Sequence, residues 1–530
     1  MTAHSRMLRM MQRRPLTSFT VTGTVGVVSF ATFREWRSEQ EEQILLESGM
    51  ATNPGDIPTL PRVYSKEALN DYWSARPVST VKRLFTVTSE LAPRFGAYLW
   101  DFHISPLNDD VGAEELQRMH ASKLKEALTR LGPAFVKGGQ QLSIRPDLVP
   151  PAVLKELQRL CDSVQPIPDQ VALQLLKHEL KCDDLNEIFD GLHLVASASL
   201  GQVYKGTLKE SGETVAIKVQ RPDMLKTFSL DLFIFQKLSL ALDTLFCSIT
   251  QQSAFREALS DDFSRGSYSE LDYEQEAANQ IRFQTELAKR KCKVKVPDVY
   301  QDYTTQKVIT TEWIDGVKLA DAPQSQINKL IPVGVELFLT QLLDIGSFHA
   351  DPHPGNLYVT TDGTLCLLDF GLCAEVDEQS RRAMTKAIVH LLMRDIDTLI
   401  AEDAKELGFL PEDFDTSELK PIMAKVLTTG LLESGSDLHM RKKKLMDISN
   451  ELNQIFFQYP FSVPPFFALV TRGLGLLEGI ALSGDPEFDI FQASAPYARR
   501  RAVEIMGAHH LRGWGTGTTR RLRRRATAAV

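Results

Sequence analysis

The sequence predicts an α+β protein in which a helical N-terminal extension precedes a small β-rich lobe and a helical C-terminal lobe. Apolar residues recur at helical spacing before residue 190 and again after residue 330. Between these regions, residues 192–220 form short runs rich in β-branched and aromatic side chains, which indicate strands. A length of 530 residues allows about two to four domains of ~100–200 residues each.

The individual elements are predicted in chain order. Residues 34–80 contain the turn signals of a connecting segment, and residues 81–131 read as helical, most clearly over 114–131. Two or three short helices are expected over 147–189, because prolines interrupt the pattern there. Further on, residues 357–359 and 365–368 flank a Thr-Asp-Gly turn and predict a hairpin, and residues 330–344 and 382–399 predict amphipathic helices.

The composition excludes several classes of protein. A hydrophobic fraction of 43% with 24% charged residues is that of an ordinary globular protein, not of a disordered chain or a coiled coil. A net charge of −8 argues against a nucleic-acid-binding body. The six cysteines include no C-x-x-C pair, so we expect free thiols in a reducing compartment, not a disulfide scaffold or a structural zinc site.

The two ends of the chain are basic and the body between them is acidic. Residues 1–14 carry +4 and residues 499–530 carry +8, which leaves about −20 for the rest. Residues 16–33 lack charge, so the N-terminus is interpreted either as a cleaved targeting peptide or as a weak single membrane anchor, with a secretory signal less favoured. The C-terminal segment is either a disordered tail, which its glycines favour, or a patch for anionic lipid headgroups.

The chemistry of the chain begins at a loop in the β-rich lobe. Laid on the glycine-rich loop G-x-G-x-x-G-x-V of kinases, the loop matches at its last glycine and its valine, but alanine replaces the first two glycines. Taken alone, it predicts only a hairpin turn. Its residues are Ala196, Ser197, Ala198, Ser199, Leu200, Gly201, Gln202 and Val203.

A strand lysine and a cluster of acids follow this loop. Lys218 ends a V-A-I-K run, the strand whose lysine pairs with nucleotide phosphates in kinases, although an exposed lysine on an edge strand is the alternative. A kinase needs a helical glutamate to hold that lysine. Glu270 and Glu276 lie six residues apart, so they are expected to serve different partners, whereas a solvated helix face is the alternative reading.

The most informative block lies near residue 350. Asp351 and Asn356 have the five-residue spacing of the kinase catalytic loop, and an Asp-Phe-Gly run begins 13 residues later at Asp369. These positions supply a carboxylate for the acceptor proton and an Asn and an Asp for Mg²⁺. A metal site built from His349, Asp351 and His353 is the rival, but it leaves Asn356 and the Asp-Phe-Gly run unexplained.

Taken together, these motifs resemble the UbiB family of atypical kinases, also called AarF-domain or ABC-one (activity of bc-one complex) kinases, over roughly residues 120–490. Details of the sequence resemble the plastid and cyanobacterial branch. The motifs that carry the resemblance are K-x-G-Q at Lys137 to Gln140, the alanine-rich loop, E-x-D at Glu270 to Asp272, Glu276, the block from His349 to Asn356, and Asp369 to Gly371.

The resemblance implies an atypical protein-kinase-like two-lobe fold whose helical N-terminal extension carries K-x-G-Q over the nucleotide site. It implies that Lys137 lies near Glu270 and Asp272, and that these three residues and Gln140 are regulatory. It also implies ATP with Mg²⁺ as cofactors, with Lys218, Glu312 and the alanine-rich loop binding the nucleotide and Glu276 holding Lys218. Asp351 would then act as base, and Asn356 and Asp369 would bind the metal.

The same resemblance implies a role in isoprenoid quinone or other prenyl-lipid metabolism. Membrane lipids and prenyl-lipid or quinone biosynthetic enzymes are the expected partners, without nucleic acid. The expected location is an organelle membrane, with the plastid favoured over the mitochondrial inner membrane. Two functions stay open: an active kinase or ATPase, and a non-catalytic ATP-binding regulator or scaffold of lipid-metabolising enzymes.

The sequence departs from kinase and family patterns in a few places. Ser197 stands where the family usually has alanine, and His349-Ala350-Asp351 lacks the arginine that reads activation-loop phosphorylation. No A-P-E run follows the Asp-Phe-Gly, and a helix is expected by about Ser380, so regulation by activation-loop phosphorylation is predicted to be absent. The expected segments are a targeting sequence or anchor (1–33), an extension (34–120), the K-x-G-Q helices (121–190), an N-lobe (191–316), a C-lobe (317–490) and a basic tail (491–530).

Overall fold

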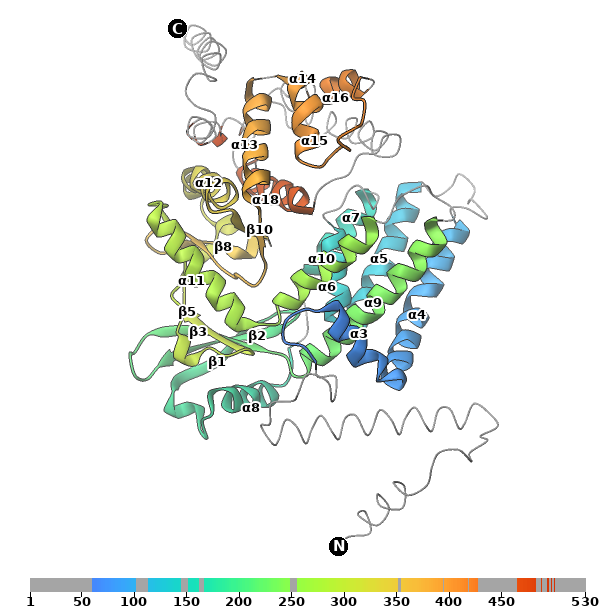
Figure 1. Ribbon diagram of the computed structural model, residues 1–530. Coiled ribbons are helices and arrows are strands. Elements are labelled where there is room, and N and C mark those ends of the chain that lie inside the picture. Colours follow the sequence, from blue (N-terminus) through green and yellow to red (C-terminus); the bar gives the residue numbers. More distant parts are fainter. Residues whose placement is uncertain are drawn as a thin grey trace, which may run out of the picture. The chain divides into compact units, whose positions relative to one another are not determined.

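A computed structural model of the chain describes residues 60–101, 113–143, 151–161, 166–247, 255–350, 354–393, 395–417, 419–427 and 465–482, with residues 488, 493, 494, 497 and 500. The chain divides into two compact units (Figure 1). Residues 1–97 with 226–261 form the first, and residues 98–225 with 262–530 form the second.

The first unit is helical. It contains α3 (Lys66–Ser74), most of α4 (Pro77–Leu99) and α9 (Met224–Cys247), and the start of α10 (Phe255–Ser269). A bidentate ion pair between Arg83 and the buried Asp231, with N–O distances of 2.6 and 2.9 Å, joins α4 to α9. The stretch 226–261 falls inside the range expected for the N-lobe, yet it packs with the helices that precede residue 98.

The helical part of the second unit begins with α5 (Ala113–Leu131), α6 (Pro133–Leu142), α7 (Pro151–Gln158) and α8 (Asp169–Leu180). The helical periodicity of 114–131 and the proline-separated helices of 147–189 are therefore confirmed among the described residues. Lys181, at φ +53°, ends α8 in the left-handed conformation that commonly closes a helix.

A four-stranded antiparallel sheet follows, in the order β1-β2-β3-β5. Val215, Ile217 and Val219 are fully buried on one face of β3, in one apolar cluster with α8. The residues between them face the opposite side, where α11 crosses the sheet (Figure 1). The strands are β1 (Phe189–Ser197), β2 (Gly201–Leu208), β3 (Thr214–Gln220) and β5 (Val308–Glu312), and α11 spans Tyr273–Lys289.

The rest of the second unit is built around one large apolar core, to which α12, α18 and the strands beside them contribute. The predicted hairpin is confirmed as β8 (Leu357–Thr360) and β9 (Leu365–Leu367), within the sheet β4-β9-β8-β6, and β7 (Ser347–His349) pairs with β10 (Cys373–Glu375). The remaining elements are β4 (Val294–Lys295), β6 (Gly316–Lys318), α12 (Gln324–Leu339), a π-helical segment (Thr340–Ile345), α13 (Glu378–Met393), α14 (Ile396–Thr398), α15 (Ala404–Glu406), α16 (Leu419–Leu427) and α18 (Pro465–Leu482).

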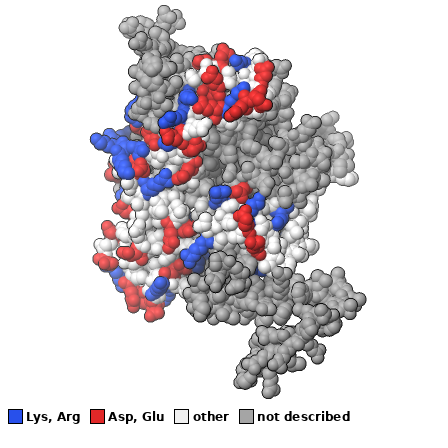
Figure 2. Space-filling model, in the orientation of Figure 1, with Lys and Arg blue, Asp and Glu red and all other residues white. Residues whose placement is uncertain are grey.

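Charge is unevenly spread on the described surface. On the face drawn in Figure 2, acidic side chains gather over α14, α15 and the chain that links α15 to α16, as expected for the acidic body of the protein. The candidate targeting segment 1–33 and residues 501–530 of the basic tail lie outside the described residues. Within the part of the chain that is described, no helix is both long enough and apolar enough to cross a bilayer.

The packing of α18 on α12 depends on one glycine. A Cβ on the buried Gly473 would lie 2.3 Å from Cε2 of Phe338, whereas one on Gly475, one half-turn further, would meet nothing within 4 Å. We expect Gly473→Ala to lower the free energy of unfolding by about 1–3 kcal/mol through overpacking. Gly475→Ala should leave it unchanged or raise it by about 0.4–1 kcal/mol. Chemical denaturation of both variants measures this, and equal effects would contradict the packing.

Candidate functional site

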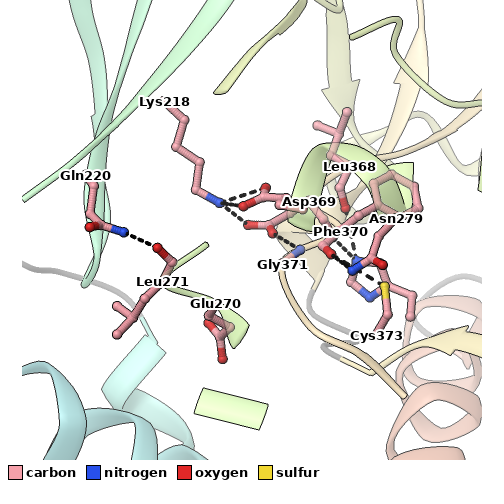
Figure 3. A network of polar contacts seen from close by, with 12 residues as sticks. Lys218, Gln220, Glu270, Leu271, Asn279, Leu368, Asp369, Phe370, Gly371 and Cys373 are labelled. Carbon is pink, nitrogen blue, oxygen red and sulfur yellow. Dashed lines mark hydrogen bonds and ion pairs between the residues drawn. The ribbon is translucent and has the colours of Figure 1, made fainter. Parts of the chain in front are cut away.

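Lys218, at the middle of the site, lies between two acids from separate parts of the chain. Its Nζ is 2.9 Å from both carboxylate oxygens of Glu276 on α11 and 3.5 Å from Oδ2 of Asp369, which follows β9. Figure 3 shows Lys218 reaching from the sheet toward Asp369. Because β3 is an inner strand, the exposed edge-strand reading of this lysine is wrong.

The electrostatics of these groups follow from burial and mutual attraction. Burial would lower the pKa of Lys218, but the carboxylates of Asp369 and Glu276 outweigh it and hold that pKa well above its ordinary value. Burial raises the pKa of Asp369, but Lys218 and the His349 ring lower it by more. The pKa of Asp369 therefore lies below its usual range. Lys218 is therefore a cation at neutral pH, and Asp369 is an anion whose side chain is 47% exposed.

The Asp-Phe-Gly segment is fixed by its neighbours. Asp369 has φ +61°, an uncommon conformation for a residue other than glycine, and its Oδ1 accepts a hydrogen bond from the Gly371 N–H at 3.2 Å. Phe370 is fully buried with its ring 5.3 Å from that of Phe283 on α11, and its carbonyl accepts a hydrogen bond from Asn279 at 3.1 Å. This segment is thereby docked against α11, the helix that supplies Glu276.

Hydrogen bonds fix His349 and Asn356, the two described residues at the ends of the catalytic-loop motif. Its strand β7 follows the π-helical segment, in which the buried Gln341 accepts a hydrogen bond from the His349 N–H at 2.8 Å. The His349 ring contacts the carbonyls of Leu368, at 3.1 Å, and of Asp369. The Asn356 carbonyl accepts from the Leu368 N–H at 2.9 Å, which places the Asn356 backbone beside the residue that precedes the Asp-Phe-Gly segment.

Asp351 and His353 lie outside the described residues, so the position of the expected base stays a prediction. The described residues contain no cluster of three or more His, Cys, Asp or Glu side chains that could hold a metal ion. Asp369 supplies a partly exposed carboxylate and Asn356 an amide, the hard oxygen ligands that Mg²⁺ takes together with substrate phosphates. These residues fit a magnesium-nucleotide site.

The alanine-rich loop is a tight hairpin between β1 and β2. The Ala198 N–H donates to the Gly201 carbonyl at 2.8 Å, and Ser197 pairs with Gln202. Gly201 is required by close packing, since a Cβ there would lie 2.5 Å from the Val219 carbonyl oxygen. The two alanine positions do not have positive φ, so alanine is accommodated without strain.

Two residues expected at the nucleotide site have side chains engaged elsewhere. The fully buried Gln202 bonds the Ile167 N–H and the Tyr204 hydroxyl, on the side of the sheet that α8 covers. The Glu312 carboxylate pairs with Lys295 and accepts from the Asp298 N–H at 3.4 Å. The role expected for Glu312 at the nucleotide stays a prediction.

The K-x-G-Q motif lies on α6, next to the E-x-D motif. Lys137 Nζ is 2.5 Å from Oε2 of Glu270, and both side chains are largely buried. Asp272 has a different partner, because its carboxylate caps the N-terminus of α11 by accepting from the N–H groups of Glu274 and Gln275. Gln140 lies one turn after Lys137 on the same helix, and its carbonyl accepts from the Ser143 hydroxyl at 2.6 Å.

Sequence reasoning missed several residues that shape the site. Asn279 and Phe283 lie one and two turns beyond Glu276 on α11, so their helical spacing was an available signal. Arg221 and Tyr273 each lie beside a recognised motif, but nothing in their spacing indicates that both reach the alanine-rich loop.

Comparison with known proteins identifies the family. The model of the ABC1 atypical kinase-like domain matches residues 159–402. The chloroplastic protein ACTIVITY OF BC1 COMPLEX KINASE 3 of Arabidopsis thaliana is 39% identical over 83% of this chain and 61% of its own length. Two uncharacterised Synechocystis sp. proteins are 37% and 36% identical, each over 83% of this chain, and over 63% and 76% of their own lengths.

Among solved structures, the complex of Rv3197 with erythromycin from Mycobacterium tuberculosis aligns with a TM-score of 0.49 at 24% identity, over 72% of this chain and 96% of that one. The chain belongs to the ABC1 atypical kinase-like family, with chloroplastic and cyanobacterial relatives, and its fold is of the α+β class. It spans about three fifths of the length of the first two relatives named above.

The ion pair at the centre of the site gives a direct prediction. Glu276→Gln removes one of the two carboxylates that raise the pKa of Lys218, so more of that lysine will be the neutral, nucleophilic amine. We expect Lys218 to react several-fold faster with an acylating reagent at pH 8, as measured by mass spectrometry. Glu286→Gln, on the same helix but paired with Lys289 at 2.8 Å, is the control. Equal labelling in both variants would contradict the pairing.

Proposed function

We propose that this member of the ABC1 atypical kinase-like family is an ATP- and Mg²⁺-dependent kinase or ATPase. The observation that carries the proposal is Lys218 held between Glu276 and Asp369, because a positioned cation next to a metal-binding carboxylate is what phosphoryl transfer requires. Asn356 beside the Asp-Phe-Gly segment supports the same reading.

The proposed roles follow from chemistry. Lys218 holds phosphate oxygens and Glu276 fixes the direction of its ammonium group. Asp369 and Asn356 would hold Mg²⁺, which when bound neutralises charge on the phosphates. Asp351 accepts the proton of the attacking hydroxyl or orients an attacking water.

The acceptor is proposed to be a small molecule or water, with a role in isoprenoid quinone or other prenyl-lipid metabolism at a plastid membrane. Support for this comes from the family resemblance, which implies that the K-x-G-Q helix blocks a peptide substrate, and from α6, whose Lys137 pairs with Glu270 and lowers the pKa of Asp369. Chloroplastic relatives support the plastid. Membrane lipids and prenyl-lipid or quinone enzymes are the proposed partners.

A second function, an ATP-binding regulator without turnover, is kept because Lys137, which pairs with Glu270, is a second cation that lowers the pKa of Asp369. A cation there competes with a metal for the carboxylate. Nucleotide binding without ADP release would favour this second function.

The first function predicts ADP release by the purified chain with Mg-ATP, measured with and without lipid vesicles and a quinone-like phenol. Asp351→Asn should lower the rate at least a hundredfold, the range that loss of a general base produces. The control is Asp302→Asn, an exposed acid in the N-lobe away from the site, which should leave the rate unchanged. Equal rates in wild type and Asp351→Asn would rule out catalysis through this carboxylate.

A further inference from the structure

Two residues outside the kinase motifs contact the alanine-rich loop. Arg221 contacts the turn from the end of β3, and Tyr273 lies beneath it at the start of α11. Neither residue has a place in the roles proposed above.

Arg221 grips the turn with both side chain and backbone. Its Nη2 donates to the Ser197 hydroxyl and to the Ala198 carbonyl, each at 3.1 Å, and its Nε donates to the same carbonyl at 3.2 Å. Its backbone N–H donates to the Leu200 carbonyl at 2.9 Å. A planar guanidinium that donates from two nitrogens to one carbonyl fixes direction as well as distance. The turn therefore cannot lift without breaking these hydrogen bonds.

Arg221 is itself anchored. It follows Gln220, whose side chain donates to the Leu271 carbonyl at 2.8 Å, so the end of β3 is tied to the E-x-D segment (Figure 3). Tyr273, two residues after Leu271, donates its backbone N–H to the Gln306 carbonyl at 3.0 Å. The turn, the strand end and the start of α11 thus form one connected unit.

Tyr273 supports the turn from below. Its ring is fully buried, and Lys218 Nζ lies 5.0 Å from the ring centre. A Cβ added to Gly201 would lie 2.8 Å from the tyrosine oxygen, so the hydroxyl is packed directly under the turn. Among the residues that the structure describes, this buried hydroxyl has no hydrogen-bond partner.

A buried hydroxyl without a partner is costly, and phenylalanine would fill the same space without that cost. Burial raises the pKa of Tyr273, so the group stays protonated and is a hydrogen-bond donor. Its neighbour is the lysine proposed to hold phosphate oxygens. A donor in that place suits an anionic oxygen.

We propose that Arg221 and Tyr273 are positioning residues for the nucleotide: Arg221 fixes the height of the alanine-rich turn, and the Tyr273 hydroxyl donates to a phosphate oxygen beside Lys218. The ligand in this inference rests on the proposed function. The hydrogen bonds from Arg221 to the turn, which we call the clamp, do not rest on it, because they join groups of the protein to each other.

The clamp is tested with Arg221→Gln, with Arg382→Gln as the control, since Arg382 is an exposed arginine paired with Glu378 on α13. Hydrogen exchange of the peptide spanning 196–203, measured without nucleotide, should become at least fivefold faster in Arg221→Gln only. Unchanged exchange would overturn the clamp.

In the same Arg221→Gln variant, the dissociation constant of a fluorescent ATP analogue with Mg²⁺ should rise about tenfold, as expected for the loss of one to two net hydrogen bonds.

The hydroxyl is tested with Tyr273→Phe, with Tyr303→Phe as the control, since the Tyr303 hydroxyl contacts Glu210 at the surface of the same lobe. We expect an unchanged or higher melting temperature without nucleotide, and a three- to tenfold higher dissociation constant for the ATP analogue. An unchanged dissociation constant would overturn the phosphate contact. If the wild type binds no nucleotide, the proposed function and this contact both fail, while hydrogen exchange still decides the clamp.

Discussion

The contact between Lys218 and Glu276 is the constraint on which the rest of the site depends. It exists because the alternation of side chains along β3 and the starting residue of α11 together bring the two side chains face to face. Strand alternation buries Val215 and Ile217 against α8 and so turns Lys218 to the opposite face of the sheet. The cap by Asp272 fixes where α11 begins, which sets the direction of Glu276 one turn later. A register shift of one residue in either element would leave two buried charges unpaired, which is far more costly than the pair itself is stabilising.

The same lysine links the two lobes of the kinase-like fold. Lys218 also contacts Asp369, and Asp369 belongs to a segment whose phenylalanine packs on Phe283 of α11. Helix α11 therefore contacts both lobes. Its Glu276 pairs with Lys218 of the sheet, and about two turns later its Phe283 packs on Phe370. Asn279 adds a hydrogen bond between these two contacts. Movement of α11 away from the sheet would expose an aromatic ring as well as separate an ion pair, so this arrangement resists opening.

What the sequence could predict was largely local. The strands of 192–220, the hairpin at 357–368 and the helix over 114–131 follow from periodicity and turn residues within short windows. Periodicity within short windows could not predict the partners of Lys137 and Arg221. Lys137 contacts Glu270, which lies 133 residues further along the chain, and Arg221 contacts a turn whose sequence predicts only a hairpin. Asp272 illustrates the ambiguity: the same carboxylate suits a lysine partner and a helix cap, and the backbone N–H groups of α11 lie nearer.

The alanines of the loop then have a physical meaning. Glycine is needed where the backbone has positive φ, and neither alanine position does: Ala196 pairs with Val203 in the β1–β2 ladder, and the Ala198 N–H donates to the Gly201 carbonyl within the turn. Glycine is retained at 201, where the Val219 carbonyl and the Tyr273 hydroxyl leave no room for a Cβ. Alanine restricts the backbone of the turn, and Arg221 donates hydrogen bonds to the Ala198 and Leu200 carbonyls, so moving the turn would break these bonds. Under the proposed function, the selectivity of the site for its ligand would therefore depend on the residues around the loop as much as on the loop itself.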